Sequence, residues 1–138
     1  MRPSTKTTAL AALATLAALA ATACDSDPTT PEGPPLFVLE VSGETFRAVV
    51  LDTMQVRLLE ERMAAGTEGV VNGELLPGDG GFNQPWGWHW DPETVHVADT
   101  SIELCDGRPS LVEEDLPYWL DTVGRFCPWG ARVVSRIR

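Results

Sequence analysis

Two short runs of β-rich sequence open the globular part of the chain. Residues 36–41 and 44–51 are rich in β-branched and aromatic side chains, and the second run alternates with the period of two that a half-buried strand requires. The dipeptide Ser42-Gly43 between them is typical of a two-residue hairpin turn. The pattern therefore predicts a β-hairpin at the start of the domain.

The period then changes to that of a helix. Asp52 or Thr53 can cap the N-terminus of this helix, and Gly66 can end it in the left-handed conformation. Its apolar stripe consists of Met54, Leu58, Leu59 and Met63. A methionine stripe can bind ligands, but here we expect it to pack into the core.

Short apolar runs separated by turn residues continue to the end of the chain. Further β-patterned segments lie at 69–76, 86–90, 95–98, 101–105 and 131–138. A second helix is predicted from Ser110, which can form a capping box with Glu113, to Gly124. Pro117 lies inside this helix and predicts a kink or a restart.

The balance of these elements predicts an α+β fold. We expect a mostly antiparallel sheet with two helices on one face and one disulfide. All of the predicted strands and helices fall within residues 36–138. This length indicates a single domain with one modest core.

The first 23 residues have a different composition. Arg2 and Lys6 precede a run of alanine, leucine and threonine over 9–23, and this layout is typical of a bacterial export signal. The run is shorter than the roughly 20 residues of a membrane span. The alternative is an ordinary Ala/Leu helix of the domain, but such a helix would have no polar face to turn to water.

The apolar run ends at Cys24 in the sequence L-A-A-T-A-C, which resembles the lipobox of bacterial lipoproteins. In those proteins the cysteine becomes the lipidated first residue. Residues 24–35 continue as a proline-rich, acidic linker. We therefore expect an exported protein, lipid-anchored to the bacterial cell envelope, with its domain in the periplasm or at the cell surface. The alternative for Cys24 is a plain cysteine, free or in a disulfide.

The chain has three cysteines, an odd number for an exported protein. If Cys24 carries lipid, Cys105 and Cys127 remain, and they should pair in an oxidising compartment. The competing interpretation is a zinc site made of two cysteines and two histidines. The spacing of the cysteines lacks the C-x-x-C pair of zinc fingers.

The charge of the chain bears on its partners. Without Arg2 and Lys6, the exported part carries 8 arginines and 20 carboxylates, a net charge of −12. Nucleic-acid binding needs a basic footprint, so this charge opposes it. It also opposes docking on anionic lipid by charge alone. Contact with a membrane is therefore expected only through the N-terminal lipid.

Three tryptophans and a histidine form the stretch W-G-W-H-W. On a strand, Trp86, Trp88 and Trp90 point to one face and His89 to the other. Small domains bury aromatic side chains, so we expect this row to be core beneath a helix. The alternative is an exposed platform for a sugar ring or a cation. Trp129 is a further aromatic residue that can be exposed.

Ligand-binding residues are expected on the face opposite the tryptophans and in the nearby loops. The candidates are His89, Asp91, His96, Asp106 and Trp129. A metal site needs three or four convergent ligands, and nearness of His89 and His96 in sequence does not establish convergence, so neither a metal nor a cofactor is predicted. The chain has no G-x-S-x-G and no H-E-x-x-H motif, so no catalytic residue is assigned.

Four motifs occur together in this chain: W-G-W-H-W-D-P, E-L-C-D-G-R-P-S, Y-W-L-D-T-V and R-F-C-P-W. In combination they resemble those of a family of small exported domains from bacteria and some eukaryotes. The resemblance covers most of residues 36–138. It implies relatives with the same domain and supplies no mechanism.

The leading functional hypothesis is an envelope-anchored, non-catalytic binding domain, with a small ligand or an envelope protein as its partner. The first alternative is a small secreted hydrolase inhibitor that presents the disulfide-held loop from Asp106 to Ser110. The second alternative is a metal-dependent enzyme that uses His89 and His96.

Overall fold

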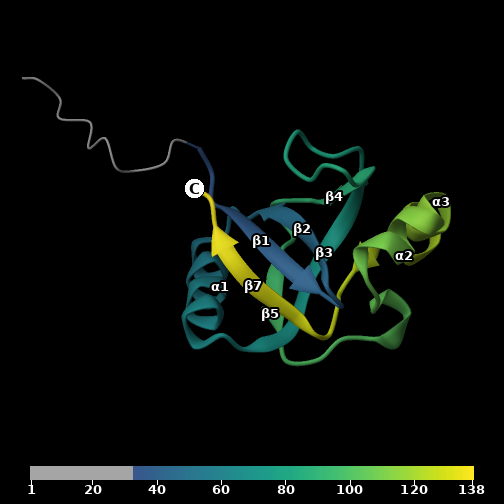
Figure 1. Ribbon diagram of the computed structural model, residues 1–138. Coiled ribbons are helices and arrows are strands. Elements are labelled where there is room, and N and C mark those ends of the chain that lie inside the picture. The colour runs from purple at the N-terminus through teal and green to yellow at the C-terminus, as the bar shows by residue number, and fades with distance from the viewer. Residues whose placement is uncertain (1–32) are drawn as a thin grey trace, which may run out of the picture.

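The computed structural model describes residues 33–138 (Figure 1). The predicted export signal at 1–23, the predicted lipidation site Cys24 and most of the linker lie outside the described residues. Within 33–138, no helix is both long and apolar enough to cross a membrane.

Seven strands in this part of the chain form one curled sheet in which all pairings are antiparallel. They are β1 (Leu36–Val41), β2 (Glu44–Val49), β3 (Glu68–Pro77), β4 (Trp88–Trp90), β5 (His96–Ala98), β6 (Arg125–Phe126) and β7 (Ala131–Arg136). Their order is β2-β1-β7-β3-β4, and β5 and β6 also pair with β3. The predicted antiparallel sheet is confirmed. So is the first hairpin, whose turn has positive φ at both Ser42 and Gly43.

The long strand β3 is paired along both edges, and each edge is interrupted. β4 and β5 share one edge and are separated by the loop 91–95. β6 and β7 share the other edge and are separated by the loop 127–130. At each interruption the chain leaves the sheet, so part of each loop is exposed to solvent, whereas Val95 and Cys127 remain buried.

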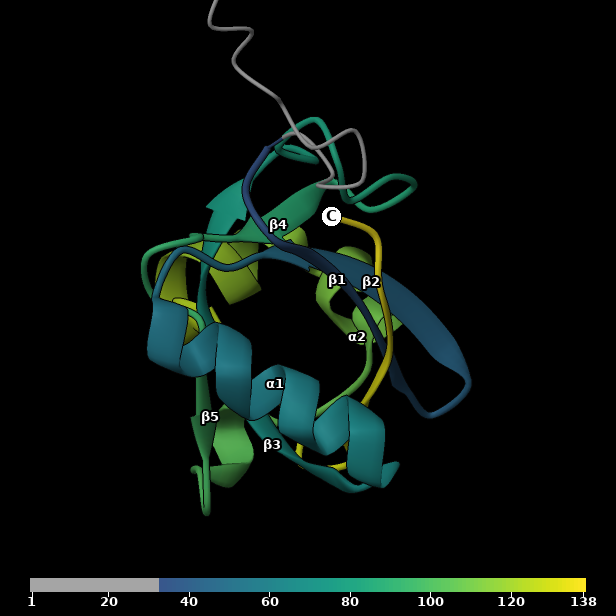
Figure 2. The ribbon, with the colours of Figure 1, turned by 90° about the vertical axis from the view of Figure 1, so that its left-hand side faces the viewer.

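The helices lie on opposite sides of the curled sheet. α1 (Thr53–Ala65) packs along β7 and β5, whereas α2 (Pro109–Glu114) lies against β2 (Figures 1 and 2). The prediction of two helices on one face is therefore wrong. Because the sheet curls, its strands do not lie in one plane. The strands that contact α1 and the strand that contacts α2 therefore lie on different sides of the molecule.

α1 begins and ends as the sequence predicts. The Asp52 carboxylate accepts hydrogen bonds from two backbone N–H groups of the first turn, and Gly66 ends the helix with a φ of 64°. Leu59 is fully buried, and Met63 packs against the core. Met54 is 67% exposed, so its assignment to the apolar stripe is wrong. It lies in the first turn, which is exposed to solvent.

The second helix begins one residue earlier than predicted. Pro109 is its first residue, which places Arg108 at the N-cap and leaves Ser110 inside the helix. The Ser110 hydroxyl donates instead to the Glu44 carboxylate of β2, at 2.7 Å. The predicted capping box is therefore wrong, and Ser110 ties α2 to the first hairpin.

Pro117 restarts the helical segment, as predicted. α2 ends at Glu114, and a short turn, α3 (Leu116–Tyr118), begins beside the proline and continues as the π-helical turn η2 (Trp119–Val123). Gly124 ends this segment with a φ of 74°.

Residues 101–105 are not the predicted strand. They contain the 3₁₀ turn η1 (Glu103–Cys105). Both edges of β3 are already occupied, by β4 and β5 on one side and by β6 and β7 on the other. This β-patterned run therefore has no free edge of β3 on which to form a ladder.

The core inside the curl is dominated by aromatic side chains. Trp88 and Trp90 of β4 are fully buried, and the ring of Phe46 packs against both, with centroids 5.7 and 4.8 Å away. Phe126 of β6 completes the cluster at 5.4 Å from the Trp88 ring. A Cβ on Gly73 of β3 would overlap the Trp90 indole, so a side chain at this position would displace the ring.

Hydrogen bonds from the segment before β4 cover the outer edge of β2. Asn83 is fully buried; its Oδ1 accepts the Arg47 N–H at 2.7 Å, and its Nδ2 donates to the Trp88 carbonyl at 2.7 Å. The half-buried Trp86 donates its indole N–H to the Thr45 carbonyl at 2.9 Å. These bonds satisfy backbone groups on the outer edge of β2, with which no other strand of the described sheet pairs.

Candidate functional site

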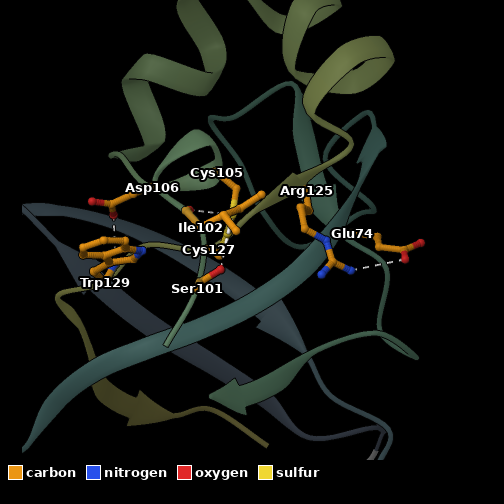
Figure 3. The surroundings of a disulfide bond; sticks show 8 residues. All are labelled: Glu74, Ser101, Ile102, Cys105, Asp106, Arg125, Cys127 and Trp129. Carbon is orange, nitrogen blue, oxygen red and sulfur yellow. Dashed lines mark hydrogen bonds and ion pairs between the residues drawn. A yellow bond between two sulfur atoms is a disulfide. The ribbon is translucent and has the colours of Figure 1, made fainter. Parts of the chain in front are cut away.

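The predicted disulfide joins Cys105 and Cys127 (Figure 3). Both residues are fully buried, and the Cys127 N–H donates to the Cys105 carbonyl at 2.8 Å. The bridge connects the end of η1 to the loop that follows β6. It therefore ties the loop 99–108 to the middle of the sheet.

Trp129 is exposed on this tied surface. It lies in the loop 127–130, between β6 and β7, and is 40% exposed. The Asp106 carboxylate accepts the Trp129 backbone N–H at 2.9 Å (Figure 3). The disulfide two residues away and this hydrogen bond hold the loop at two points, so the indole stands on a constrained backbone.

Two hollows adjoin at the turn that carries Trp129. The larger, of about 660 Å³, lies between the β1–β2 turn and the disulfide-tied loop, and its lining includes Ser42, Glu68, Asp106, Gly107, Arg108 and Gly130. The other, of about 480 Å³, has a lining that includes Arg62, Glu68, Asp99, Thr100, Ser101 and Trp129. The hollows meet at Glu68, the first residue of β3.

A third hollow, of about 590 Å³, continues the second one along α1. It shares Arg62, Ala98 and Asp99 with the second hollow and adds Leu58 and Glu61 from the helix. Through these shared residues the three hollows adjoin one another in a row, from α1, past Trp129, to the first hairpin turn. We call the residues that line them the Trp129 groove.

The Trp129 groove is acidic. Glu61, Glu68, Asp99 and Asp106 line it, and none of these carboxylates forms an ion pair with another residue in 33–138. Arg132 lies opposite Glu68 in the sheet but pairs with a glutamate of β1 instead. The groove therefore offers several carboxylates that have no cationic partner within the described structure.

Both arginines of the groove are engaged in structural contacts. The Arg62 guanidinium donates to the carbonyls of Val70, at 3.0 Å, and Ala98, at 3.3 Å. The Arg108 guanidinium lies 3.6 Å from the Glu44 carboxylate, which does not line the groove. Arg62 thus links α1 to β3 and β5. The charge of Arg108 is neutralised by a glutamate that does not line the groove.

The structure brings together two of the five predicted ligand-binding residues, Asp106 and Trp129. His89 and His96 each place Nδ1 near a backbone carbonyl, at 2.7 and 2.9 Å. Asp91 accepts the backbone N–H of the second residue after it. These three residues have local partners and do not line the Trp129 groove.

His89 and His96 also do not converge on one point. Their partners across the sheet are Leu76 and Asn72, four residues apart on β3, which is on the order of 13 Å along a strand. Among residues 33–138, no three His, Cys, Asp or Glu side chains are grouped so that they could hold a metal ion. The geometry therefore gives no support to a metal enzyme built on these histidines.

Most residues of the groove were not predicted from the sequence. Arg62, Glu68 and Asp99 come from α1, β3 and the loop after β5, and no local motif connects them. Only the pairing of β5 with β3, and the packing of α1 against β5 and β7, brings them to one place. The feature of the sequence that indicated this surface was Trp129, the aromatic residue that follows Cys127.

A separate acidic residue organises the loop 78–85, which carries Asn83. The Asp79 carboxylate accepts the Gly81 backbone N–H at 2.9 Å. This hydrogen bond, aided by one from the Gln84 side chain, lowers the pKa of Asp79 below its usual value. The ionised carboxylate therefore stabilises the turn that precedes β4.

Comparison with known families identifies the domain. Residues 35–138 match the BP-74 N-terminal domain. No curated protein and no solved structure matches the chain. The matched region contains the curled sheet, the disulfide and the whole Trp129 groove. The chain therefore belongs to the BP-74 N-terminal domain family.

Proposed function

We propose that this chain is a non-catalytic binding domain and that the Trp129 groove is its binding surface. The observation that carries the proposal is the exposed Trp129 indole, which lines one of two adjoining hollows on a backbone held by the disulfide and by Asp106. A large aromatic side chain on a preformed concave surface gives apolar contact and little loss of conformational freedom on binding.

The contents of the groove favour binding over catalysis. No histidine or cysteine lines its three hollows. The Ser101 hydroxyl, a possible nucleophile, lies 3.4 Å from the sulfur of Cys105, which is in the disulfide and cannot act as a base. A nucleophilic enzyme needs an activating base hydrogen-bonded to its nucleophile, and within the described residues the Ser101 hydroxyl is hydrogen-bonded to no carboxylate or imidazole.

The inhibitor alternative has less support than the groove. An inhibitory loop protrudes toward its target enzyme, whereas the loop from Asp106 to Ser110 is held against the domain. Pro109 is buried, Asp106 is bonded to the Trp129 backbone, and Ser110 is bonded to Glu44. This loop serves better as a wall of the groove.

We also propose that the domain is attached to the cell envelope through a lipid on Cys24. The support is the export-type segment before this residue and the linker after it. Replacing Cys24 by Ser should move the protein from the membrane fraction to the soluble fraction. Wild-type protein that is already soluble, with no lipid mass on its N-terminus, would rule out the anchor.

The binding role is tested with one array of basic, acidic and neutral peptides and neutral oligosaccharides, probed with exported wild-type protein and two variants. Trp129→Ala removes the indole. Tyr118→Ala is the matched control, because Tyr118 is 43% exposed and does not line the groove. We expect the control to keep the wild-type pattern and Trp129→Ala to weaken binding several-fold. Binding that Trp129→Ala leaves unchanged, or an array with no binding at all, would contradict the proposal.

A further inference from the structure

We propose that the Trp129 groove takes an extended peptide segment, rich in arginine or lysine, from a partner protein. This inference rests on the proposed binding function and adds the chemical class of the partner. The size of the groove is the first argument. Each of its three hollows, of about 660, 480 and 590 Å³, has the volume of a pocket for one drug-sized molecule, and the three adjoin. An extended chain can fill such a row, whereas one small ligand would occupy only a part of it.

Charge is the second argument, and it selects a cationic segment. The groove is lined by four carboxylates that have no ion pair in 33–138: Glu61, Glu68, Asp99 and Asp106. They are distributed over all three hollows, so basic side chains spaced along a peptide can each meet one. The exported part of the chain has a net charge of −12, which repels acidic partners and attracts basic ones.

The central hollow supplies the position that an arginine or lysine side chain fits best. Trp129, Glu68 and Asp99 line it together. A guanidinium or ammonium group over the face of an indole gains a cation–π interaction, and a carboxylate beside it adds a charge-assisted hydrogen bond. The hollow also contains Arg62, but its two carboxylates outnumber this cation, whose donors are directed to the carbonyls of Val70 and Ala98.

The test uses the full exported chain in mild detergent and fluorescence anisotropy of a labelled peptide that alternates arginine and serine. Its acidic counterpart alternates glutamate and serine, and spermidine serves as a free polycation competitor. We expect the arginine peptide to bind, the affinity to fall as salt is raised, and the acidic peptide not to bind. Spermidine should compete only at concentrations far above that of unlabelled arginine peptide.

Four variants locate the site. Trp129→Ala should weaken binding roughly fivefold, as loss of a cation–π contact implies. Glu68→Gln and Asp99→Asn should each weaken it by roughly threefold, the size of one exposed ion pair. Asp121→Asn, in η2, removes one negative charge that does not line the groove, and it should change affinity little. Circular dichroism melting curves should show that all four variants keep the wild-type fold.

Three outcomes would overturn the inference: no binding of the arginine peptide, an equal effect of Asp121→Asn and Asp99→Asn, or spermidine competing as well as the peptide. The last would make the ligand a small polycation. If the arginine peptide fails while another array probe still binds in a manner that depends on Trp129, the binding function stands and only the partner class is wrong. If no probe binds in a manner that depends on Trp129, both the binding function and the partner class are wrong.

Discussion

Two tryptophan-containing segments of this domain have opposite environments. In 86–90, Trp88 and Trp90 are fully buried, whereas in 126–130 Trp129 is 40% exposed. Both segments lie beside β3. β4 stays paired with β3 through Trp90, so the alternation of a strand turns its indoles inward. The pairing of β6 stops at Phe126, and the chain has left the sheet when it reaches Trp129. In these two segments, backbone pairing to β3 distinguishes the buried tryptophans from the exposed one.

The two segments are also held in place by different means. The first is fixed by close packing of aromatic rings and by the buried amide of Asn83. The second is fixed by the Cys105–Cys127 disulfide and by the hydrogen bond that the Trp129 backbone N–H donates to Asp106. Because the second segment does not depend on burying its indole, the indole remains available for contact with a partner.

The largest effect is expected from truncating a buried indole. Trp88→Ala should lower the free energy of unfolding by roughly 3–5 kcal/mol, because it leaves a large cavity in the aromatic core. Trp129→Ala should change it by no more than about 0.5 kcal/mol, the usual range for an exposed position. Urea denaturation at neutral pH measures both values.

Trp88→Phe serves as the conservative control for this comparison. The Trp88 indole N–H has no hydrogen-bond partner in 33–138, so phenylalanine loses mainly volume and should be less damaging than alanine. Equal losses for Trp88→Ala and Trp129→Ala would show that the two segments do not differ as described.

Removing the disulfide should have the next largest effect. Cys105 and Cys127 are separated by 22 positions, and the chain-entropy relation gives roughly 3 kcal/mol for a loop of this length. The double variant to Ala should lose about this much stability. In native-state hydrogen exchange, protection should fall first in 99–108 and 127–130, with β4 affected least. Uniform loss of protection, or free thiols in the wild-type protein, would show that the bridge does not specifically support the Trp129 surface.

The parts of the fold that follow from local sequence could be predicted. The hairpin turn depends on Ser42-Gly43, the ends of α1 on Asp52 and Gly66, and the helix restart on Pro117. In each case a residue satisfies or breaks the backbone within a few positions of itself. The disulfide followed from counting cysteines, which likewise needs no knowledge of the fold.

What could not be predicted depends on how distant segments meet. The segment 101–105 has the composition of a strand but finds no free edge of β3, and Ser110 bonds to Glu44, 66 positions away, rather than to its own helix. The position of α1 relative to α2 depends on the curl of the whole sheet. The groove has the same origin, because Arg62, Glu68 and Asp99 meet only after β5 has paired with β3.

Asn83 gives a smaller effect that tests how the buried segment is held. Asn83→Ala leaves the Arg47 N–H and the Trp88 carbonyl without their partner, and we expect a loss of roughly 2 kcal/mol, the usual cost of a buried polar group left unsatisfied. Gln84→Ala, at the exposed neighbouring position, is the control and should cost much less. Thermal melting distinguishes them, and similar melting temperatures for the two variants would show that the Asn83 bonds contribute little.

The smallest effect concerns Asp79, in the loop that presents Asn83 to β4. The Gly81 N–H lowers the pKa of this carboxyl in the folded state. A lowered folded-state pKa stabilises the fold at pH values above the unfolded pKa, about 4 for Asp, and this contribution is lost as the pH falls through the folded-state value. Asp79→Asn keeps an acceptor for Gly81 but carries no charge. It should therefore melt slightly below wild type at pH 7, and this difference in melting temperature should disappear under acidic conditions.

Asp121→Asn is the control for the loss of one surface charge. Because Trp129 is held from a different loop, Asp79→Asn should leave probe binding at the groove unchanged at every pH at which the protein is folded. A gap that widens on acidification would mean that the Asp79 carboxylate does not stabilise this loop.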